Sequence, residues 1–367
     1  MTCSVYYITF FFFFFFFFFL NYYCEAQNQK ASALYVFGDS LVDVGNNNYL
    51  KLSIVKANHF PYGIDFPSKK PTGRFSNGKN AADFIAEELG LPTSPPYLSL
   101  VSESKANKDN VSIVGGASFA SAGAGIFDGS DQRYKQSIPL RKQVDYYVEA
   151  HNEMLKQIGE SALQEHLSSS IFTVVIGSND LSGYFDSSNL RHKSTPQQYL
   201  DSMLFSLRAQ LQRIYENGGR KFEIAGIGAV GCCPARRLKN NTECEAEINF
   251  WALKYNEGLK SMLQEWQSQN HGLAYTFFDT YAANDDLILN PSTHGFSEVR
   301  AACCGLGELR ARAPCLPVTK FCSNRKDHVF WDQYHPTETA SRILVDKIFN
   351  GPSQYTSPIT LKELLHL

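Results

Sequence analysis

Short apolar runs recur along the chain and alternate with longer segments of helical periodicity. Four runs, rich in β-branched and aromatic side chains, predict buried strands at 34–37, 171–176, 222–227 and 274–278. A strand that is covered on both faces of a parallel sheet has such a continuous apolar run, whereas a half-exposed strand alternates. The pattern therefore predicts strands at the centre of a sheet with both faces covered.

Between these runs, apolar positions repeat at helical spacing, which predicts amphipathic helices. We place them over 80–89, 138–155, 161–167, 196–217, 245–267 and 336–349. Glycines follow the first and fourth of these segments, where glycine commonly ends a helix, and Pro336 suits a first helical turn. A further helix is expected directly after Ser40, and the stretch 94–110, with two prolines and scattered charge, is interpreted as a loop.

Strands that alternate with helices predict a three-layer α/β/α sandwich with a central parallel sheet. In such sheets ligands bind beyond the carboxyl ends of the strands. Ser40 directly follows the first predicted strand, and Asn179 lies just beyond the second, so both are expected at this edge. His335 is expected to reach the same edge from a loop.

The N-terminus carries an unbroken run of phenylalanine, Phe10–Phe19, which Ile8 and Leu20 extend. Its length fits the apolar region of a secretory signal and is short for a membrane span. We predict a signal peptide over 1–26 and one folded domain over 27–367, because no internal repeat or Pro-rich linker divides the rest. No Lys or Arg precedes the run, so an uncleaved anchor or a translated repeat remains the alternative.

The overall charge excludes some classes of partner. Lys and Arg total 34 and Asp and Glu total 36, a formal net charge of −2. A near-neutral chain lacks the basic footprint of a nucleic-acid-binding protein. The sequence also shows no basic patch dense enough to hold a membrane surface. We expect no nucleic-acid partner and no stable membrane insertion after signal cleavage, and the oligomeric state stays open.

Nine cysteines are present, and two of them, Cys3 and Cys24, would leave with the signal. The others lack the paired Cys-x-x-Cys spacing of a zinc site, so we predict disulfides and no metal. Cys232 or Cys233 is expected to form a disulfide with Cys244. Cys303 or Cys304 is expected to bond with Cys315 and Cys322 in a second cross-linked loop. Seven is odd, so at least one thiol is free or pairs between chains.

Two Asn-x-Ser/Thr sequons, at Asn110 and Asn240, lie in polar stretches. Such sequons accept glycans in secreted proteins. They predict glycosylation at both asparagines and agree with an extracellular destination.

The chemistry-bearing residues are a serine after the first strand and an aspartate three residues before a histidine. Ser40 lies in Phe37-Gly-Asp-Ser-Leu41, and Asp332 and His335 lie in Asp332-Gln-Tyr-His-Pro336. A serine hydroxyl is a poor nucleophile at neutral pH unless a base takes its proton and an acid orients the base. The order Ser…Asp…His is compatible with an acyl-transfer hydrolase. The sequence contains no Gly-x-Ser-x-Gly elbow and no motif that implies a cofactor.

Two further blocks add to these motifs, a small-residue run over 115–125 and Gly177-Ser-Asn-Asp180. With all four blocks in order, the chain resembles the GDSL, or SGNH, hydrolase family, and stretches 37–47, 61–66, 71–78 and 302–307 resemble its plant branch. The resemblance extends from about residue 33 to about residue 350. It implies a flavodoxin-like sandwich.

The resemblance also implies roles for individual residues. Ser40 would be the nucleophile, with His335 as base and Asp332 as its partner. The oxyanion hole would comprise the backbone N–H groups of Ser40 and Gly123 and the side-chain amide of Asn179.

Structural alternatives remain for these residues. Ser40 could cap a helix, Asp332 and His335 could cap the last helix, and Asn179 could serve a turn. Asp39 and Asp43 flank Ser40; Asp39 is interpreted as holding the turn, with a role as an alternative acid partner for a histidine left open, and Asp180 beside Asn179 is interpreted in the same way. One departure from the plant pattern is Ser118-Phe-Ala120, where relatives usually have Asn-Phe-Ala, and we expect it to change local hydrogen bonding but not the chemistry.

These observations predict a secreted serine esterase or lipase that needs no cofactor and acts on a small-molecule or lipid ester through an acyl-enzyme. Its expected location is the apoplast or cell wall. A carbohydrate O-deacetylase or an acyltransferase would use the same residues. A non-catalytic extracellular binding protein is the remaining alternative.

Overall fold

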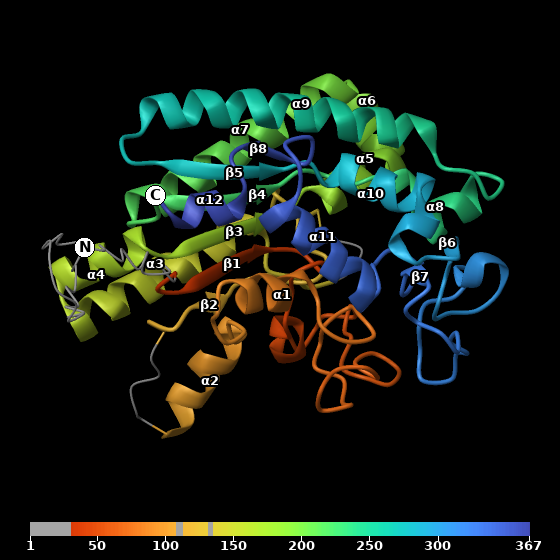
Figure 1. Cartoon of the computed structure of the whole chain (residues 1–367), viewed down its shortest axis with the longest axis horizontal. Helices are drawn as coiled ribbons and strands as arrows, with labels where there is room; N and C mark the ends of the chain where they lie inside the picture. Colours follow the sequence, from red (N-terminus) through yellow and green to blue (C-terminus); the bar gives the residue numbers. More distant parts are fainter. Residues whose placement is uncertain (1–30, 108–112, 131–134) are drawn as a thin grey trace, which may run out of the picture.

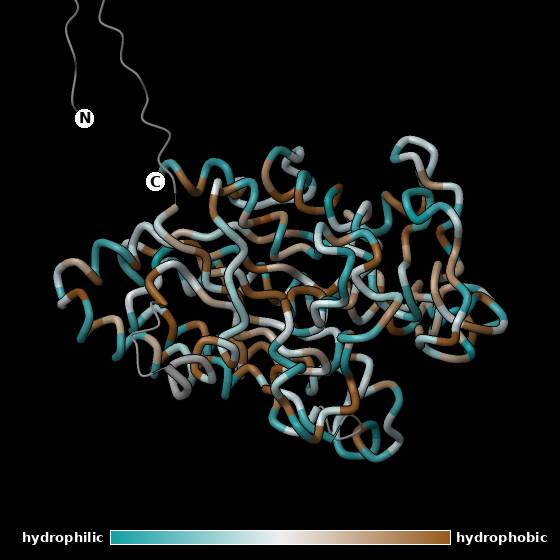
Figure 2. The backbone as a smooth tube through the Cα atoms, turned by 90° about the horizontal axis from the view of Figure 1, so that it is seen from below, coloured by the Kyte–Doolittle hydropathy of each residue, from teal (hydrophilic) through white to brown (hydrophobic). Residues whose placement is uncertain are grey.

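A six-stranded sheet runs through the middle of the molecule, with helices on both faces (Figure 1). The computed structural model describes residues 31–107, 113–130 and 135–367. The predicted signal peptide and the sequon asparagine Asn110 lie outside these residues. Figure 2 shows hydrophobic segments passing through the interior, while many outer turns are hydrophilic.

The sheet has the strand order β2-β1-β3-β4-β5-β8. The bounds are β1 Leu34–Gly38, β2 Ala117–Ser118, β3 Ile171–Val175, β4 Lys221–Ala225, β5 Ala274–Phe278 and β8 Thr356–Pro358. The first five strands in this order are parallel, and β8 pairs antiparallel with β5 at the edge. All four predicted strands are confirmed. β2 and β8 were not predicted, because two or three residues are too few to show a periodicity.

Five helices cover one face: α3 Leu140–Ile158, α4 Glu160–Ser168, α5 Ser178–Asp186, α7 Pro196–Glu216 and α9 Ala246–Gln269. The core between them and the sheet is largely aromatic. Tyr35, Phe172 and Phe222 stand side by side on neighbouring strands, and Trp266 packs edge-on against Phe222. Tyr35 and Phe37 of the first strand are therefore buried on this face.

The opposite face is covered by α1 Ala81–Glu88, α10 Thr280–Leu289, α11 Glu338–Asn350 and α12 Leu361–Leu365 (Figure 1). Leu34 and Val36 of β1 are buried in the same cluster as Val345 and Ile348 of α11. Helices on both faces of a mostly parallel sheet confirm the predicted three-layer α/β/α fold.

Two predicted segments differ in the structure. No α-helix follows Ser40; a loop leads to the 3-10 helix η1 Asn46–Tyr49, because the Asp43 carboxylate accepts the backbone N–H groups of Gly45 and Asn46. The stretch interpreted as a loop contains α2 Tyr97–Asn107. Pro95 and Pro96 directly precede the helix. At that position the N–H that proline lacks would not take part in an intrahelical hydrogen bond.

The last helix also begins later than predicted. α11 starts at Glu338, and the Thr337 side chain caps it by accepting the N–H of Ala340. Pro336 therefore precedes the cap and is not in the first turn.

The region between α10 and α11 forms a lobe beside the sheet (right of Figure 1). It contains a two-stranded parallel ladder of β6 Glu298–Ala302 and β7 His328–Phe330, with 3-10 helices η4 Pro291–His294 and η5 Glu308–Arg310. The shorter elements α6 Ser188–Lys193, η3 Val230–Cys232 and α8 Pro234–Lys239 lie elsewhere in the chain.

Three disulfides settle the pairings that the sequence left open. Cys303 pairs with Cys322 and Cys304 with Cys315 in the lobe, and Cys232 pairs with Cys244. Cys233 is the free thiol and is buried, which confirms the prediction that one of the seven would remain. Within the described ranges no helix is long and apolar enough to cross a membrane.

Candidate active site

The turn that carries Ser40 is held tightly at the carboxyl edge of the sheet. Gly38 ends β1 at a φ of +155°, and a Cβ there would lie 2.3 Å from the Val175 carbonyl oxygen, so only glycine fits. The Gln143 carboxamide accepts the Gly38 N–H and donates to the Gly38 carbonyl, both at 2.8 Å. The strand end is thereby fixed and Ser40 projects beyond it.

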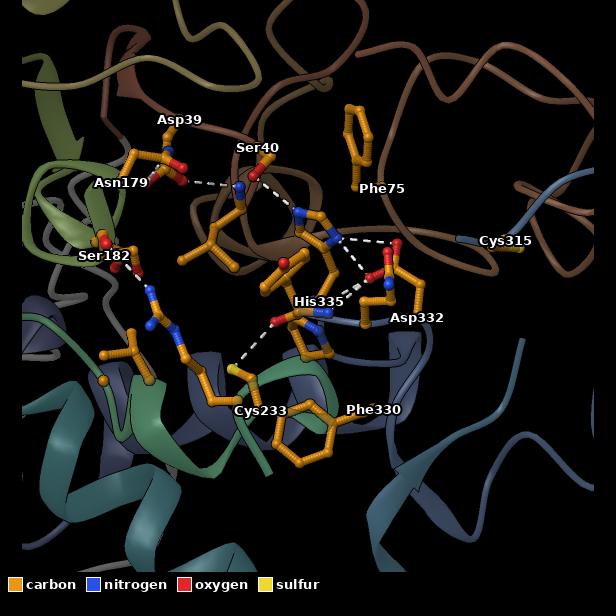
Figure 3. Close-up of a pocket in the computed structure, with 18 of the residues that line it drawn as sticks. Asp39, Ser40, Phe75, Asn179, Ser182, Cys233, Cys315, Phe330, Asp332 and His335 are labelled. Atoms are coloured by element: carbon orange, nitrogen blue, oxygen red, sulfur yellow. Dashed lines mark hydrogen bonds and ion pairs between the residues drawn. The ribbon is translucent and has the colours of Figure 1, made fainter. Parts of the chain in front are cut away.

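Ser40, His335 and Asp332 form a hydrogen-bonded relay (Figure 3). His335 Nε2 lies 2.7 Å from Ser40 Oγ, and Nδ1 lies 2.7 and 2.9 Å from the two Asp332 oxygens. These distances allow proton transfer from the hydroxyl to the imidazole. Ser40 does not cap a helix, because no helix begins there. Asp332 and His335 do not cap the last helix, because Thr337 caps α11.

The Asp332 carboxylate is buried but well supplied with donors. It accepts hydrogen bonds from the backbone N–H groups of Tyr334 and His335 and from the Tyr62 hydroxyl at 2.8 Å. Burial alone would raise the pKa of Asp332, but the neighbouring His335 and these hydrogen bonds hold that pKa below its ordinary value. The group is therefore ionised at neutral pH and able to orient the imidazole.

Two aromatic residues complete the surroundings of His335 and were not assigned from the sequence. The Phe75 ring lies 4.8 Å from the imidazole, centre to centre, and Tyr62 packs edge-on against Phe75. Both lie inside stretches that resemble the plant branch of the family, 61–66 and 71–78. That resemblance was the available signal, but only the fold shows which side chains reach Asp332 and His335.

The residues that supply the three predicted oxyanion-hole groups, Ser40, Gly123 and Asn179, line one cavity. Gly123 has a φ of +83°, a conformation that favours glycine. The Asn179 amide donates to the Ala124 carbonyl at 3.0 Å, which orients it. The backbone N–H groups of Ser40 and Gly123 donate to no acceptor in the described parts of the chain.

Asp39 and Asp180 accept backbone N–H groups, as predicted, and Asp43 does so as well. Asp39 accepts the N–H of Leu41, and burial raises its pKa to about 7. Asp43 accepts the N–H of Ala122 as well as those in its own loop. Asp180 accepts the backbone N–H groups of Ile126 and Phe127 and the Ser130 hydroxyl.

Ser118, which stands where the plant pattern usually has asparagine, has a fully buried hydroxyl without a hydrogen-bond partner among the described residues. Its backbone carbonyl accepts instead from the Asn46 side chain, which also donates to the Ala120 carbonyl. Asn46 therefore links the nucleophile loop to the small-residue run through main-chain contacts.

The cavity above Ser40 has a volume of about 360 Å³ and two kinds of wall. Serines, Asn179 and the Arg236–Asp186 ion pair contribute polar groups from α5 and α8. Large apolar side chains come from η3, α10, β7 and α11: Val230, Leu287, Ile288, Val329, Phe330 and Leu344.

Two lining residues are unavailable for chemistry. Arg236 donates to both Asp186 oxygens, to Glu245 and to the Ser182 carbonyl, so its guanidinium is committed to the wall. Cys233 donates weakly to the Tyr334 carbonyl, and burial raises the pKa of its thiol to about 12. A neutral thiol is a poor nucleophile, so Ser40 is the reactive group that the cavity offers.

The remaining predicted residue, Asn240, is exposed, and its side-chain nitrogen donates to the Cys244 carbonyl. Its sequon lies inside the loop that the Cys232–Cys244 disulfide closes. Among the described residues, no group of three or more His, Cys, Asp or Glu side chains is arranged to hold a metal ion.

Comparison with known proteins identifies the family. The family model described as GDSL-like Lipase/Acylhydrolase matches residues 34–348. GDSL esterase/lipase At5g55050 of Arabidopsis thaliana is 54% identical over 336 residues, which are 90% of this chain and 89% of that protein. GDSL esterase/lipase At5g37690 of the same plant is 35% identical over 341 residues, 92% of this chain and 94% of the relative. The chain therefore belongs to the GDSL lipase/acylhydrolase family and is a carboxylic ester hydrolase.

Proposed function

We propose that this protein is a secreted serine esterase or lipase in which Ser40 is the nucleophile, His335 the general base and Asp332 the acid that orients it. The observation that carries the proposal is the relay of 2.7 Å contacts from Ser40 Oγ through His335 to Asp332, at the floor of a cavity with an apolar wall.

The reaction follows from this geometry. Ser40 Oγ attacks the ester carbonyl carbon while its proton moves to His335 Nε2. The negative charge on the carbonyl oxygen is stabilised by the N–H groups of Ser40 and Gly123 and by the Asn179 amide. His335 then protonates the leaving alkoxide, and the acyl group stays on Ser40. Water, activated by His335, releases the acid and restores the serine.

The cavity walls support an assignment of the two halves of the substrate. A hydrocarbon chain is best accommodated among Leu287, Ile288 and Leu344, which would remove its apolar surface from water. The alcohol half is assigned to the polar wall. An ester with a chain of several carbons is therefore the preferred substrate, and an acetyl ester would leave the apolar wall empty.

Secretion is supported by the three disulfides, since such bonds persist in oxidising compartments. The apolar N-terminal run supplies the signal, and glycosylation is expected at Asn110 and at the exposed Asn240. The proposed location is the extracellular space.

The test is hydrolysis of p-nitrophenyl acetate, butyrate and palmitate by purified wild type, Ser40→Ala and Ser182→Ala. Ser182 lines the same cavity but lies outside the relay, so Ser182→Ala is a matched control that removes one hydroxyl from the same cavity. Loss of the nucleophile lowers kcat/KM by several orders of magnitude, whereas Ser182→Ala retains most activity. Equal activity in wild type and Ser40→Ala would overturn the proposal.

The same assay separates the related activities. Acetate turnover alone would favour a deacetylase, and turnover that rises with chain length would support the assigned acyl wall. Ester products formed in the presence of a competing alcohol would reveal acyl transfer. A folded wild type that turns over no ester would leave an extracellular binding role.

A further inference from the structure

Two loops border the mouth of the cavity, residues 50–60 and residues 313–321, which we call the mouth loops. Ile54, Lys56 and His59 of the first loop and Pro314 and Leu316 of the second line the cavity, and the solvent exposure of Ile54 and Leu316 places them at its opening. The two loops meet through an edge-on contact between Phe60 and Phe321, 5.7 Å between ring centres. They therefore form one continuous rim beside Ser40, although they are far apart in the sequence.

The mouth loops expose an unusual amount of apolar surface. The exposed fraction is 68% for Leu52, 61% for Ile54 and 85% for Val318, and Phe60 and Leu316 are also exposed. Single exposed apolar side chains are ordinary on a protein surface, but a group of them around one opening marks an interaction surface.

The exposure is built into the fold. Beneath the rim lies a small buried cluster that contains Ala57, Tyr62 and Trp331 with the Cys303–Cys322 and Cys304–Cys315 disulfides. The Thr319 hydroxyl also exchanges hydrogen bonds with the backbone of Leu316. The apolar side chains are thus held outward on a cross-linked support and are not swung out on a loose segment.

The charges on the mouth loops are all of one sign. They contain three lysines, Lys51, Lys56 and Lys320, and no carboxylate, although the whole chain has a net charge of only −2. None of the three lysines forms an ion pair within the described residues. Asp65 and Glu308, which lie a few residues from the loops in the sequence, are each paired with an arginine.

We infer that the mouth loops are a docking surface for an anionic lipid surface. Aliphatic and aromatic side chains enter the boundary between headgroups and acyl chains, while lysines reach the negatively charged headgroups. A protein partner seated on the same rim would cover the cavity entrance, whereas a lipid surface would leave an ester facing it. Docking itself does not need catalysis; its use in delivering an ester to Ser40 rests on the proposed function.

The test measures co-sedimentation of Ser40→Ala, which leaves lipids intact, with vesicles of phosphatidylcholine alone or mixed with phosphatidylglycerol. The protein is expected to bind the mixed vesicles and to bind less at high salt. Leu52→Ser with Val318→Ser, neither of which lines the cavity, is expected to weaken binding at least about tenfold. Lys51→Gln and Lys320→Gln are expected to weaken it about fivefold each.

Phe205→Ser is the matched control, since Phe205 is 78% exposed but lies on α7, outside the mouth loops. It should leave vesicle binding unchanged. The fold is checked in a protein that keeps Ser40. There, Leu52→Ser with Val318→Ser should hydrolyse soluble p-nitrophenyl butyrate at the wild-type rate.

Three outcomes would overturn the inference: no binding to mixed vesicles, equal binding after the Leu52 and Val318 substitutions, or an equal loss with Phe205→Ser. Its failure is distinct from failure of the proposed function. Vesicle binding without ester hydrolysis by wild type would remove only the esterase proposal, and hydrolysis without vesicle binding would remove only the docking surface.

Discussion

Two buried carboxyl groups in this protein differ in charge. Asp332, beside Ser40, accepts hydrogen bonds from Tyr62, His335 and two backbone N–H groups, and its pKa lies below the ordinary value. Glu223, in the middle of β4, is also fully buried, but no described donor lies within hydrogen-bonding distance of its oxygens, and the nearby Thr173 hydroxyl lowers its pKa by less than burial raises it. Burial raises the pKa of Glu223 to about 8, so it is mainly neutral at pH 7.

The surroundings of Glu223 explain the difference. In the register of the sheet it stands between Thr173 of β3 and Thr276 of β5, on the face covered by α11 and α12 (Figure 1). The Thr276 hydroxyl has no partner among the described residues, and the Thr173 hydroxyl offsets only part of the effect of burial on Glu223. Burial by itself removes a charge, and a buried carboxylate stays ionised only where the fold supplies donors. The proposed mechanism needs the charge at Asp332.

Asp332→Asn is expected to have the largest effect. The amide removes the negative charge and permits the wrong imidazole tautomer, so kcat/KM for p-nitrophenyl butyrate should fall by about 10³ to 10⁴. Asp327→Asn is the control, because Asp327 contacts His328 in a similar pair outside the cavity. Equal losses in both variants would show that Asp332 acts only through folding.

Glu223→Gln tests the other carboxyl through stability. The unfolded chain releases this proton near pH 4.5, whereas the folded protein holds it up to about pH 8. Between these two pH values, unfolding therefore releases a proton. The contribution of Glu223 to the free energy of unfolding falls by roughly 1 kcal/mol for each pH unit in this window and stops changing above the folded pKa.

In Glu223→Gln this contribution is absent, so its free energy of unfolding should fall less steeply across the same pH window. Urea unfolding at several pH values measures the difference between the two proteins. Asp39 and Asp43, whose pKa values burial also raises, contribute to both curves alike. Parallel curves for wild type and variant would show that Glu223 does not hold its proton.

Tyr62→Phe should convert part of Asp332's environment into that of Glu223. Loss of one hydroxyl donor raises the pKa of Asp332 and loosens the orientation of His335, with an expected loss of about tenfold in kcat/KM. The acid limb of the pH–rate profile should move to higher pH, which a purely structural defect would not produce. Tyr97→Phe, which loses a hydroxyl contact to Glu149 outside the cavity, should leave that profile in place.

Thr276→Val should have the smallest effect, and a favourable one. It removes a buried hydroxyl that has no partner and keeps the shape, so the free energy of unfolding should rise by roughly 1 kcal/mol. Thr319→Val removes a hydroxyl that exchanges two hydrogen bonds with Leu316 and should lower stability by a similar amount. A loss in both variants would mean that Thr276 is hydrogen-bonded in solution.

Several features could be predicted because their signals are local. The strands at 34–37 and 171–176 follow from short apolar runs, and Ser40 and His335 lie in motifs of a few residues. Tyr62, Phe75 and Gln143 could not be assigned, because their importance depends on contacts that no local pattern shows. The hydrogen bond from Tyr62 to Asp332, for example, joins positions 270 apart.

The sequence by itself determined the alternation of strands and helices, the family and the residues of the relay, since each depends on a short segment. The tertiary structure decided the disulfide partners, the absence of a helix after Ser40, and which buried carboxyl receives donors. It also brought together the two mouth loops, which carry three lysines and no carboxylate, where the linear sequence showed no basic patch. The physical reason is the same in each case: burial, hydrogen bonding and local charge depend on which side chains the fold places together.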